Sequence, residues 1–182
     1  YLGPEFMEFV KACRDEAKKQ GMLAYLYDED RWPSGTAGSL VTENPEYGAR
    51  YLTFSREEKE SLGNLYIETL AVYDVALDED GLLSSFKRLG ENEEAKNEKW
   101  YAYLKSERPS GWFNGATYLS TTNKEAVKNF IDVTYEAYKR EVGEDFGEVV
   151  PAIFTDEPRY GGFENKMQKD YAKDGKPVTF AF

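Results

Sequence analysis

Two acidic runs contain the side chains in this sequence that are best suited to chemistry. The first is Asp28-Glu29-Asp30, with Trp32 close behind, and the second is Asp156-Glu157, followed directly by Pro158. The chain contains no histidine and one cysteine, Cys13. This composition excludes, within the chain, a Ser-His-Asp triad, a Cys-His pair and a Cys-rich or imidazole-bearing metal site. Acid–base chemistry must therefore come from carboxylates, tyrosine, lysine or Cys13.

Each acidic run follows an apolar run that is typical of a buried strand. Residues 22–27 are six apolar or aromatic residues without alternation, and residues 149–154 form a second such run. If the two strands are parallel neighbours, both acidic loops open at the same edge of one sheet. Two opposed carboxyl groups are the minimum for hydrolysis of a glycosidic bond, in which one donates a proton and the other activates water or attacks the sugar.

Other interpretations of these residues compete with this one. An acidic run after a strand also forms solvated loops and helix caps, and carboxylate clusters also bind Mg²⁺ or Ca²⁺. Aromatic residues make up 15% of the chain; their flat faces suit a sugar-binding cleft, although most such side chains pack in cores. Residues 34–38 lack the Gly-Lys-Ser/Thr ending of a phosphate loop, and that interpretation is rejected.

Charge and length restrict the partners. The 182 residues carry a net charge of −11, which argues against binding to nucleic acid or to an anionic membrane surface. No apolar run reaches the roughly 20 residues that span a bilayer. Both ends look cut, so we expect a fragment of a longer multidomain enzyme that self-associates through open sheet edges. The missing targeting signal favours a cytoplasmic location only slightly.

The elements that must position the acids follow an α/β pattern. A helix over 5–20 begins after Pro4 and is capped by Gly21, with Cys13 expected on its buried face. Further strands are expected at 116–119 and 150–154, parallel to 22–27 in one sheet, and a helix at 123–142.

Residues 63–105 interrupt this pattern with sequential strands joined by short connections, including a turn at 78–81, so they should be antiparallel. The predicted organisation is therefore a first segment at 1–62, a small antiparallel β insertion at 63–105, and a second segment at 106–182.

Three motifs together resemble a known family. Residues 27–35 read Tyr-Asp-Glu-Asp-Arg-Trp-Pro-Ser-Gly and are followed by Ala37-Gly38. Residues 112–115, Trp-Phe-Asn-Gly, precede a predicted strand, and residues 154–158, Phe-Thr-Asp-Glu-Pro, end another. In their types and order these motifs resemble the α-L-rhamnosidase-like group of large bacterial glycoside hydrolases, over nearly the whole chain.

The resemblance implies the first half of a (β/α)8 barrel and a role for each motif. It implies Glu157 as general acid and a carbohydrate as substrate, with the second catalytic carboxylate outside this chain. It implies no metal ligand or cofactor here, although related enzymes can carry Ca²⁺. Asp stands at 156 where many such barrels have Asn. The residues expected to contact sugar are Asp28, Glu29, Asp30, Trp32, Trp112, Asn114 and Asp156. A carbohydrate-binding or scaffold domain without catalysis is the alternative.

Overall fold

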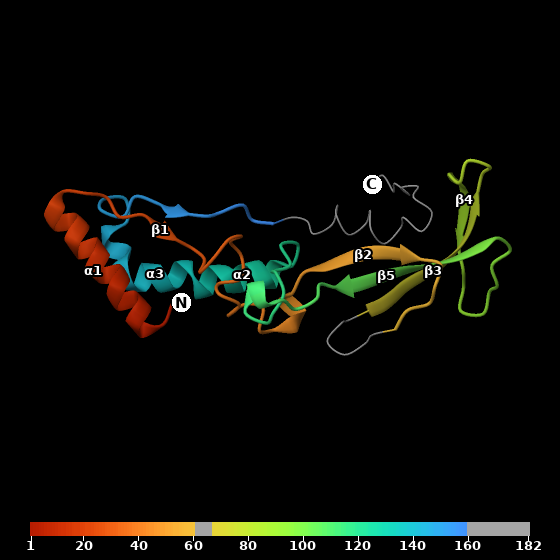
Figure 1. Ribbon diagram of the computed structural model, residues 1–182, viewed down its shortest axis with the longest axis horizontal. Coiled ribbons are helices and arrows are strands. Elements are labelled where there is room, and N and C mark those ends of the chain that lie inside the picture. The colour runs from red at the N-terminus through yellow and green to blue at the C-terminus, as the bar shows by residue number, and fades with distance from the viewer. Residues whose placement is uncertain (61–66, 160–182) are drawn as a thin grey trace. The chain divides into compact units, whose positions relative to one another are not determined.

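The computed structural model describes residues 1–60 and 67–159, which form two compact units. Unit 1 contains residues 1–49 and 109–159, and unit 2 contains residues 50–60 and 67–108. The parts of the three predicted segments that fall at 61–66 and 160–182 lie outside the described residues. In chain order the elements are α1 (Pro4–Gln20), β1 (Leu26–Tyr27), η1 (Pro45–Tyr47), β2 (Arg50–Ser55), β3 (Ile67–Leu77), β4 (Leu83–Arg88), β5 (Glu98–Ser106), η2 (Gly111–Phe113), α2 (Lys124–Val133), α3 (Tyr135–Val142), η3 (Gly143–Asp145) and β6 (Ile153–Phe154) (Figure 1).

Helix α1 forms where the sequence predicts it, but Cys13 is exposed rather than buried. Pro4 occupies the first turn, and Gly21 ends the helix in the left-handed conformation with φ 65°. Only the N-terminal half packs on apolar neighbours. The C-terminal half is held by Lys18 and Arg14, which pair with the buried Asp145 at 2.9 and 2.5 Å and lower the pKa of that carboxyl group. Cys13 therefore lies beyond the apolar contact.

Strands β1 and β6 are parallel neighbours, as predicted, with Leu26 opposite Ile153 and Tyr27 opposite Phe154. Both strands are shorter than the apolar runs that contain them. The expectation that residues 22–27 are buried on both faces is wrong, because Met22, Leu23 and Tyr25 are exposed and only Leu26 is buried. Within the described residues this sheet has two strands, and its faces are only partly covered, because Tyr27 and Ile153 are half-buried and Phe154 is exposed.

The prediction that residues 116–119 form a third strand of this sheet is also wrong. Leu119 instead makes an isolated antiparallel bridge with Gly48. The backbone bonds of the segment are made with residues around η1, since Ala49 N–H donates to the Tyr118 carbonyl at 2.7 Å and Ser120 N–H donates to the Tyr47 carbonyl at 2.8 Å. These hydrogen bonds occupy the Tyr118 carbonyl and the Ser120 N–H, backbone groups that would otherwise be available to a neighbouring strand.

The predicted helix over 123–142 is divided into α2 and α3 at Thr134. Asn123 caps the start, and its side-chain oxygen accepts from Glu125 N–H and Ala126 N–H at 3.0 and 3.1 Å. Thr134 is fully buried, and its hydroxyl donates to the Phe130 carbonyl four residues earlier at 2.5 Å. Such back-bonding distorts a helix and accounts for the break.

Two apolar cores hold unit 1 together. One core joins α1, β1 and α3 through the buried residues Met7, Leu26, Ala137, Tyr138, Val142 and Val150. The other core joins the loops to α2 through the buried residues Ala37, Val41, Phe113, Tyr118, Leu119, Ala126 and Phe130. The second core supports the segment that follows the first acidic run, so the loop bearing those acids rests on a packed base.

Unit 2 is a four-stranded antiparallel sheet in the order β2-β5-β3-β4. The turn between β3 and β4 is where the sequence predicts it, and the Asp78 carboxylate accepts from Asp80 N–H and Leu82 N–H at 3.0 and 2.8 Å. Strand β2 was not predicted, so unit 2 begins at residue 50 rather than 63. The signal for β2 is the run of β formers Tyr51-Leu52-Thr53-Phe54.

The fold is thus α/β, with one parallel pair in unit 1 and one antiparallel sheet in unit 2. Both sheets are small and open among residues 1–60 and 67–159, and these residues form no closed barrel.

Candidate functional site

The parallel pairing of β1 and β6 brings the two acidic runs to one edge of unit 1. Each run follows the last residue of its strand, and parallel strands end at the same edge. Side chains connect the loops directly: the Trp32 indole N–H donates to Glu157 Oε2 at 3.1 Å. The prediction that both runs share one edge of a sheet is confirmed.

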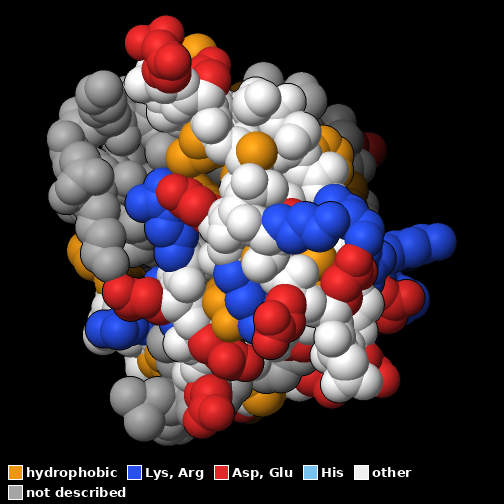
Figure 2. Space-filling view, turned by 90° about the vertical axis from the view of Figure 1, so that its right-hand side faces the viewer, with side chains coloured by type: hydrophobic (Ala, Val, Ile, Leu, Met, Phe, Trp, Pro, Cys, Tyr) orange, Lys and Arg blue, Asp and Glu red, His pale blue; other side chains and the backbone are white. Residues whose placement is uncertain are grey.

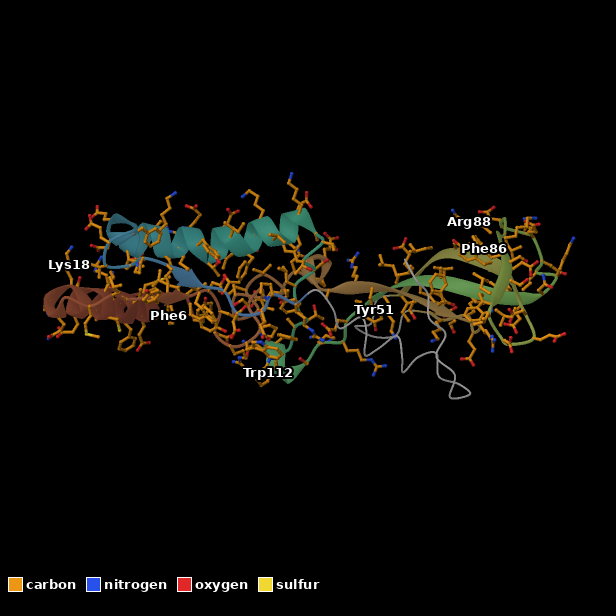
Figure 3. The ribbon with its side chains drawn as sticks, turned by 90° about the horizontal axis from the view of Figure 1, so that it is seen from above. Phe6, Lys18, Tyr51, Phe86, Arg88 and Trp112 are labelled. Atoms are coloured by element: carbon orange, nitrogen blue, oxygen red, sulfur yellow. The ribbon has the colours of Figure 1, made fainter. Side chains whose placement is uncertain are left out.

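Glu157 and two tryptophans form the exposed part of this edge. Glu157 is exposed and has a positive φ of 41°, so the chain is no longer extended at this residue. Trp32 and Trp112 are 49% and 54% exposed. The Trp112 indole N–H donates to the Trp32 carbonyl at 2.7 Å, and Trp112 projects from η2 on the side of unit 1 away from α2 and α3 (Figure 3). One indole therefore bonds to the Glu157 carboxylate, and the second indole bonds to the backbone of the first.

Asp28 lies beneath this surface and has no exposed area. Its Oδ2 accepts from the hydroxyls of Tyr135 and Thr155, each at 2.7 Å, whereas Oδ1 is buried with no hydrogen-bond partner among the described residues. Burial raises the pKa of the Tyr135 phenol, and Asp28 adds to the increase, whereas the hydrogen bond with Thr155 opposes it. Asp28 thus connects the end of β1 to α3 and to the residue before Asp156.

Glu29 points into its own loop and is 2% exposed. Five backbone N–H groups and one hydroxyl donate to its carboxylate, at 2.5 to 3.0 Å; the donors belong to Asp30, Gly35, Thr36, Ala37 and Gly38. The expected sugar contact of Glu29 stays a prediction, but these bonds already surround both of its oxygens.

The other predicted site residues join the same loops. Asp30 Oδ2 accepts from the Arg31 guanidinium at 2.9 and 3.1 Å and from the Asn114 amide at 3.4 Å. The Asn114 amide also donates to the Gly38 carbonyl at 3.0 Å. Asp156 pairs with Ser34 twice: its N–H donates to the Ser34 hydroxyl and its carbonyl accepts from the Ser34 N–H, both at 2.9 Å. The structure therefore gathers all eight predicted residues around one loop system.

Sequence reasoning missed the hydroxyl groups that support the site. The Tyr118 hydroxyl donates to the Ser34 carbonyl at 2.5 Å and accepts from Arg159 N–H at 2.8 Å. Burial raises the pKa of Tyr118 to about 12. Gly35 has a φ of 143°, and a Cβ built there would lie 2.7 Å from the Tyr118 hydroxyl oxygen. The sequence features that could have indicated these supporting groups are Ser34-Gly35 inside the first motif and Thr155 inside the third.

The side chains at this edge are mainly acidic and aromatic. Among residues 1–60 and 67–159 no group of three or more acidic or Cys side chains converges as a metal site. No helix in this part of the chain is long and apolar enough to cross a membrane. The edge carries the exposed Glu157 carboxylate and two partly exposed indoles, groups that can accept hydrogen bonds from a ligand and pack against it.

Comparison of the chain with protein-family models, with curated proteins and with solved structures finds no significant match. The resemblance to α-L-rhamnosidase-like hydrolases therefore stays a prediction that rests on the three sequence motifs.

Proposed function

We propose that this chain is part of a glycoside hydrolase and that Glu157 is its general acid. The observation that supports the proposal is the bond from the Trp32 indole to the Glu157 carboxylate, beside a second partly exposed indole, at the edge shared by β1 and β6. Glycosidases flank the scissile bond with carboxyl groups, and indole faces pack against sugar rings. In a chain without histidine, carboxyl groups are among the side chains left for acid–base catalysis.

In this proposal unit 1 belongs to a (β/α)8 barrel, whose catalytic groups lie at the carboxyl ends of its strands. The parallel order of β1 and β6, with both acidic runs at that end, agrees with such a barrel. Unit 2 is then an insertion into the barrel domain.

The proposed reaction needs two carboxyl groups with separate roles. Protonated Glu157 gives its proton to the glycosidic oxygen as the bond from that oxygen to the anomeric carbon breaks. The second carboxylate, expected outside this chain, either adds to the anomeric carbon or takes a proton from the water that does so. Trp32 and Trp112 hold the ring, while Asp30, Asn114 and Asp156 accept or donate hydrogen bonds to its hydroxyls. No cofactor takes part.

A carbohydrate-binding domain without catalysis is the second candidate. It is favoured by the exposure of Glu157 and by its bond to an indole, since a carboxylate that only binds sugar hydroxyls needs no burial. Glu157→Gln separates the two, because the amide keeps the shape of the side chain but cannot donate a proton as an acid.

The test uses the longest natural protein that contains this chain, assayed on a panel of glycosides. We expect Glu157→Gln to lower turnover by about 10²–10⁴-fold for poor leaving groups and by much less for a dinitrophenyl group, which departs without a proton. Sugar affinity should be kept. The matched control is Glu148→Gln, which changes an exposed glutamate of unit 1 that precedes β6 in the chain. Undiminished turnover in Glu157→Gln would reject the catalytic role, and binding without turnover in the wild type would favour the second candidate.

A further inference from the structure

The loop over residues 30–38 begins and ends on a single carboxylate. Asp30 N–H, at the start, donates to Glu29 Oε1 at 3.0 Å. At the end of the loop, Gly38 N–H donates to the same oxygen, and residues 35–37 donate to Oε2. Successive N–H groups that converge in this way form an anion-binding nest. Here the anion is a side chain of the protein itself.

These bonds already fill the hydrogen-bonding positions of the Glu29 carboxylate. A carboxylate offers about four lone-pair sites, and six donors already surround this one. The side chain is also almost fully buried. Hydrogen bonds to an ionised acceptor are about twice as strong as neutral ones, so the loop conformation depends strongly on this group.

Residues 31–34 lie between the two anchored ends, and they contain Trp32. This is the residue whose indole N–H meets Glu157 at 3.1 Å and whose carbonyl accepts from Trp112 at 2.7 Å. Ser34 provides a further attachment through its two bonds to Asp156. The position of the Trp32 indole therefore depends on the hydrogen bonds that hold the two ends of the 30–38 loop on Glu29.

We propose that Glu29 is a positioning residue: its carboxylate is the internal anion that folds the 30–38 loop and thereby holds the Trp32 indole against Glu157. A catalytic effect of holding Trp32 against Glu157 rests on the proposed function. The role of Glu29 in holding Trp32 there does not. Because the role of Glu29 can be tested without a substrate, failure of this proposal is distinguishable from failure of the hydrolase proposal.

The test follows the indole N–H resonances of the 182-residue chain labelled with ¹⁵N-tryptophan. The three tryptophans, Trp32, Trp100 and Trp112, are assigned by single Trp→Phe variants. Glu157→Gln should shift the Trp32 resonance, because that substitution changes the acceptor of its hydrogen bond. In a Glu29→Ala background the same substitution should shift Trp32 by less than about half as much, as expected for coupled residues. Trp100 lies in unit 2 and is the internal reference.

Acetate provides the readout that distinguishes positioning by an anion from a general packing role. Glu29→Ala removes a group about the size of acetate, so added acetate should restore both the Trp32 resonance and its response to Glu157→Gln. Acetamide has the same shape but only one acceptor oxygen and no charge, and it should restore both less completely than acetate does. An undiminished response in Glu29→Ala, or equal rescue by acetamide, would overturn the proposal.

A second variant covers the case in which Glu29→Ala does not fold. Glu29→Gln keeps the shape and one acceptor oxygen, and we expect it to reduce the Trp32 response partly. The proposal limits the role of Glu29 to the 30–38 loop. Loss of the helical circular-dichroism signal in both variants, with and without acetate, would therefore overturn it as well.

Discussion

At the scale of single residues, Asp28, Glu29 and Asp30 show why an acidic run cannot be interpreted from its composition alone. Asp28 faces the hydroxyls of Tyr135 and Thr155, Glu29 faces backbone N–H groups, and Asp30 faces Arg31 and Asn114. The motif predicted that these acids lie at the site. It did not predict their partners, because these depend on a loop return through Ala37 and Ser39, non-glycine residues with positive φ.

The close approach of Gly35 to Tyr118 gives the first prediction. Gly35→Ala forces a methyl group to within 2.7 Å of the Tyr118 hydroxyl oxygen and strains a φ of 143°. We expect a loss of about 2–4 kcal/mol in the free energy of unfolding of unit 1, measured by urea denaturation. The matched control is Gly115→Ala, with a φ of 87° and no atom near its added Cβ. That variant should lose only about 1 kcal/mol. Equal losses would show that the contact with Tyr118 is unimportant.

Tyr118 itself gives a prediction for alkaline pH. Burial raises its pKa from 10.0 to about 12, so above pH 10 the unfolded chain releases a proton that the folded chain retains. Its contribution to stability is therefore complete below pH 10 and is lost as the pH rises to about 12, by at most about 1.4 kcal/mol per pH unit. Tyr118→Phe should make the fall in unfolding free energy between pH 10 and 12 shallower than in the wild type. Identical slopes would contradict this assignment.

At the scale of elements, the sequence was most informative where local rules decide the outcome. Helix α1 and the β3–β4 turn have their own caps and hydrogen bonds, and both were predicted. The prediction of a strand at residues 116–119 was wrong, because their apolar pattern fits a strand equally well in any sheet. Their actual partners near Gly48 are distant in sequence. The prediction that Cys13 is buried was wrong for a related reason, since a helix face is buried only as far as the neighbouring element extends.

The parallel register of β1 and β6 can be tested by crosslinking in a Cys13→Ser background. Tyr27 and Phe154 are opposite each other, and their rings are 5.9 Å apart. Adjacent strands lie about 4.8 Å apart, within the reach of a disulfide. We expect Tyr27→Cys with Phe154→Cys to form an intrachain disulfide readily on mild oxidation, measured as loss of free thiol. Tyr27→Cys with Ala152→Cys is the control, because two residues of offset separate the Cα atoms by about 8 Å. Equal rates for both pairs would contradict the register.

At the scale of the whole chain, we expect two opposing surface properties to govern association between copies. The net charge of −11 makes copies repel one another, although acidic and basic side chains are intermixed on the face shown in Figure 2. Large apolar side chains of unit 1, among them Tyr25 and Phe154, are exposed at 65% and 58% near the parallel pair. Parallel strands are normally covered on both faces, whereas an antiparallel sheet tolerates one face in water. The charge therefore opposes an association that the β1–β6 surface favours.

This opposition predicts self-association that increases with salt. Raising the ionic strength from about 0.01 M to about 0.15 M shortens the Debye length from roughly 30 to roughly 8 Å and weakens the repulsion, while apolar contacts keep their strength. Sedimentation equilibrium should show a larger average mass at the higher salt concentration. Tyr25→Ser with Phe154→Ser should abolish the increase, because these side chains lie beside the open parallel pair. Leu82→Ser with Phe86→Ser changes equally exposed side chains at the β3–β4 hairpin and should leave the increase unchanged. A chain that stays monomeric at both salt concentrations, or one whose association is abolished only by the hairpin substitutions, would show that the parallel pair is not the associating surface.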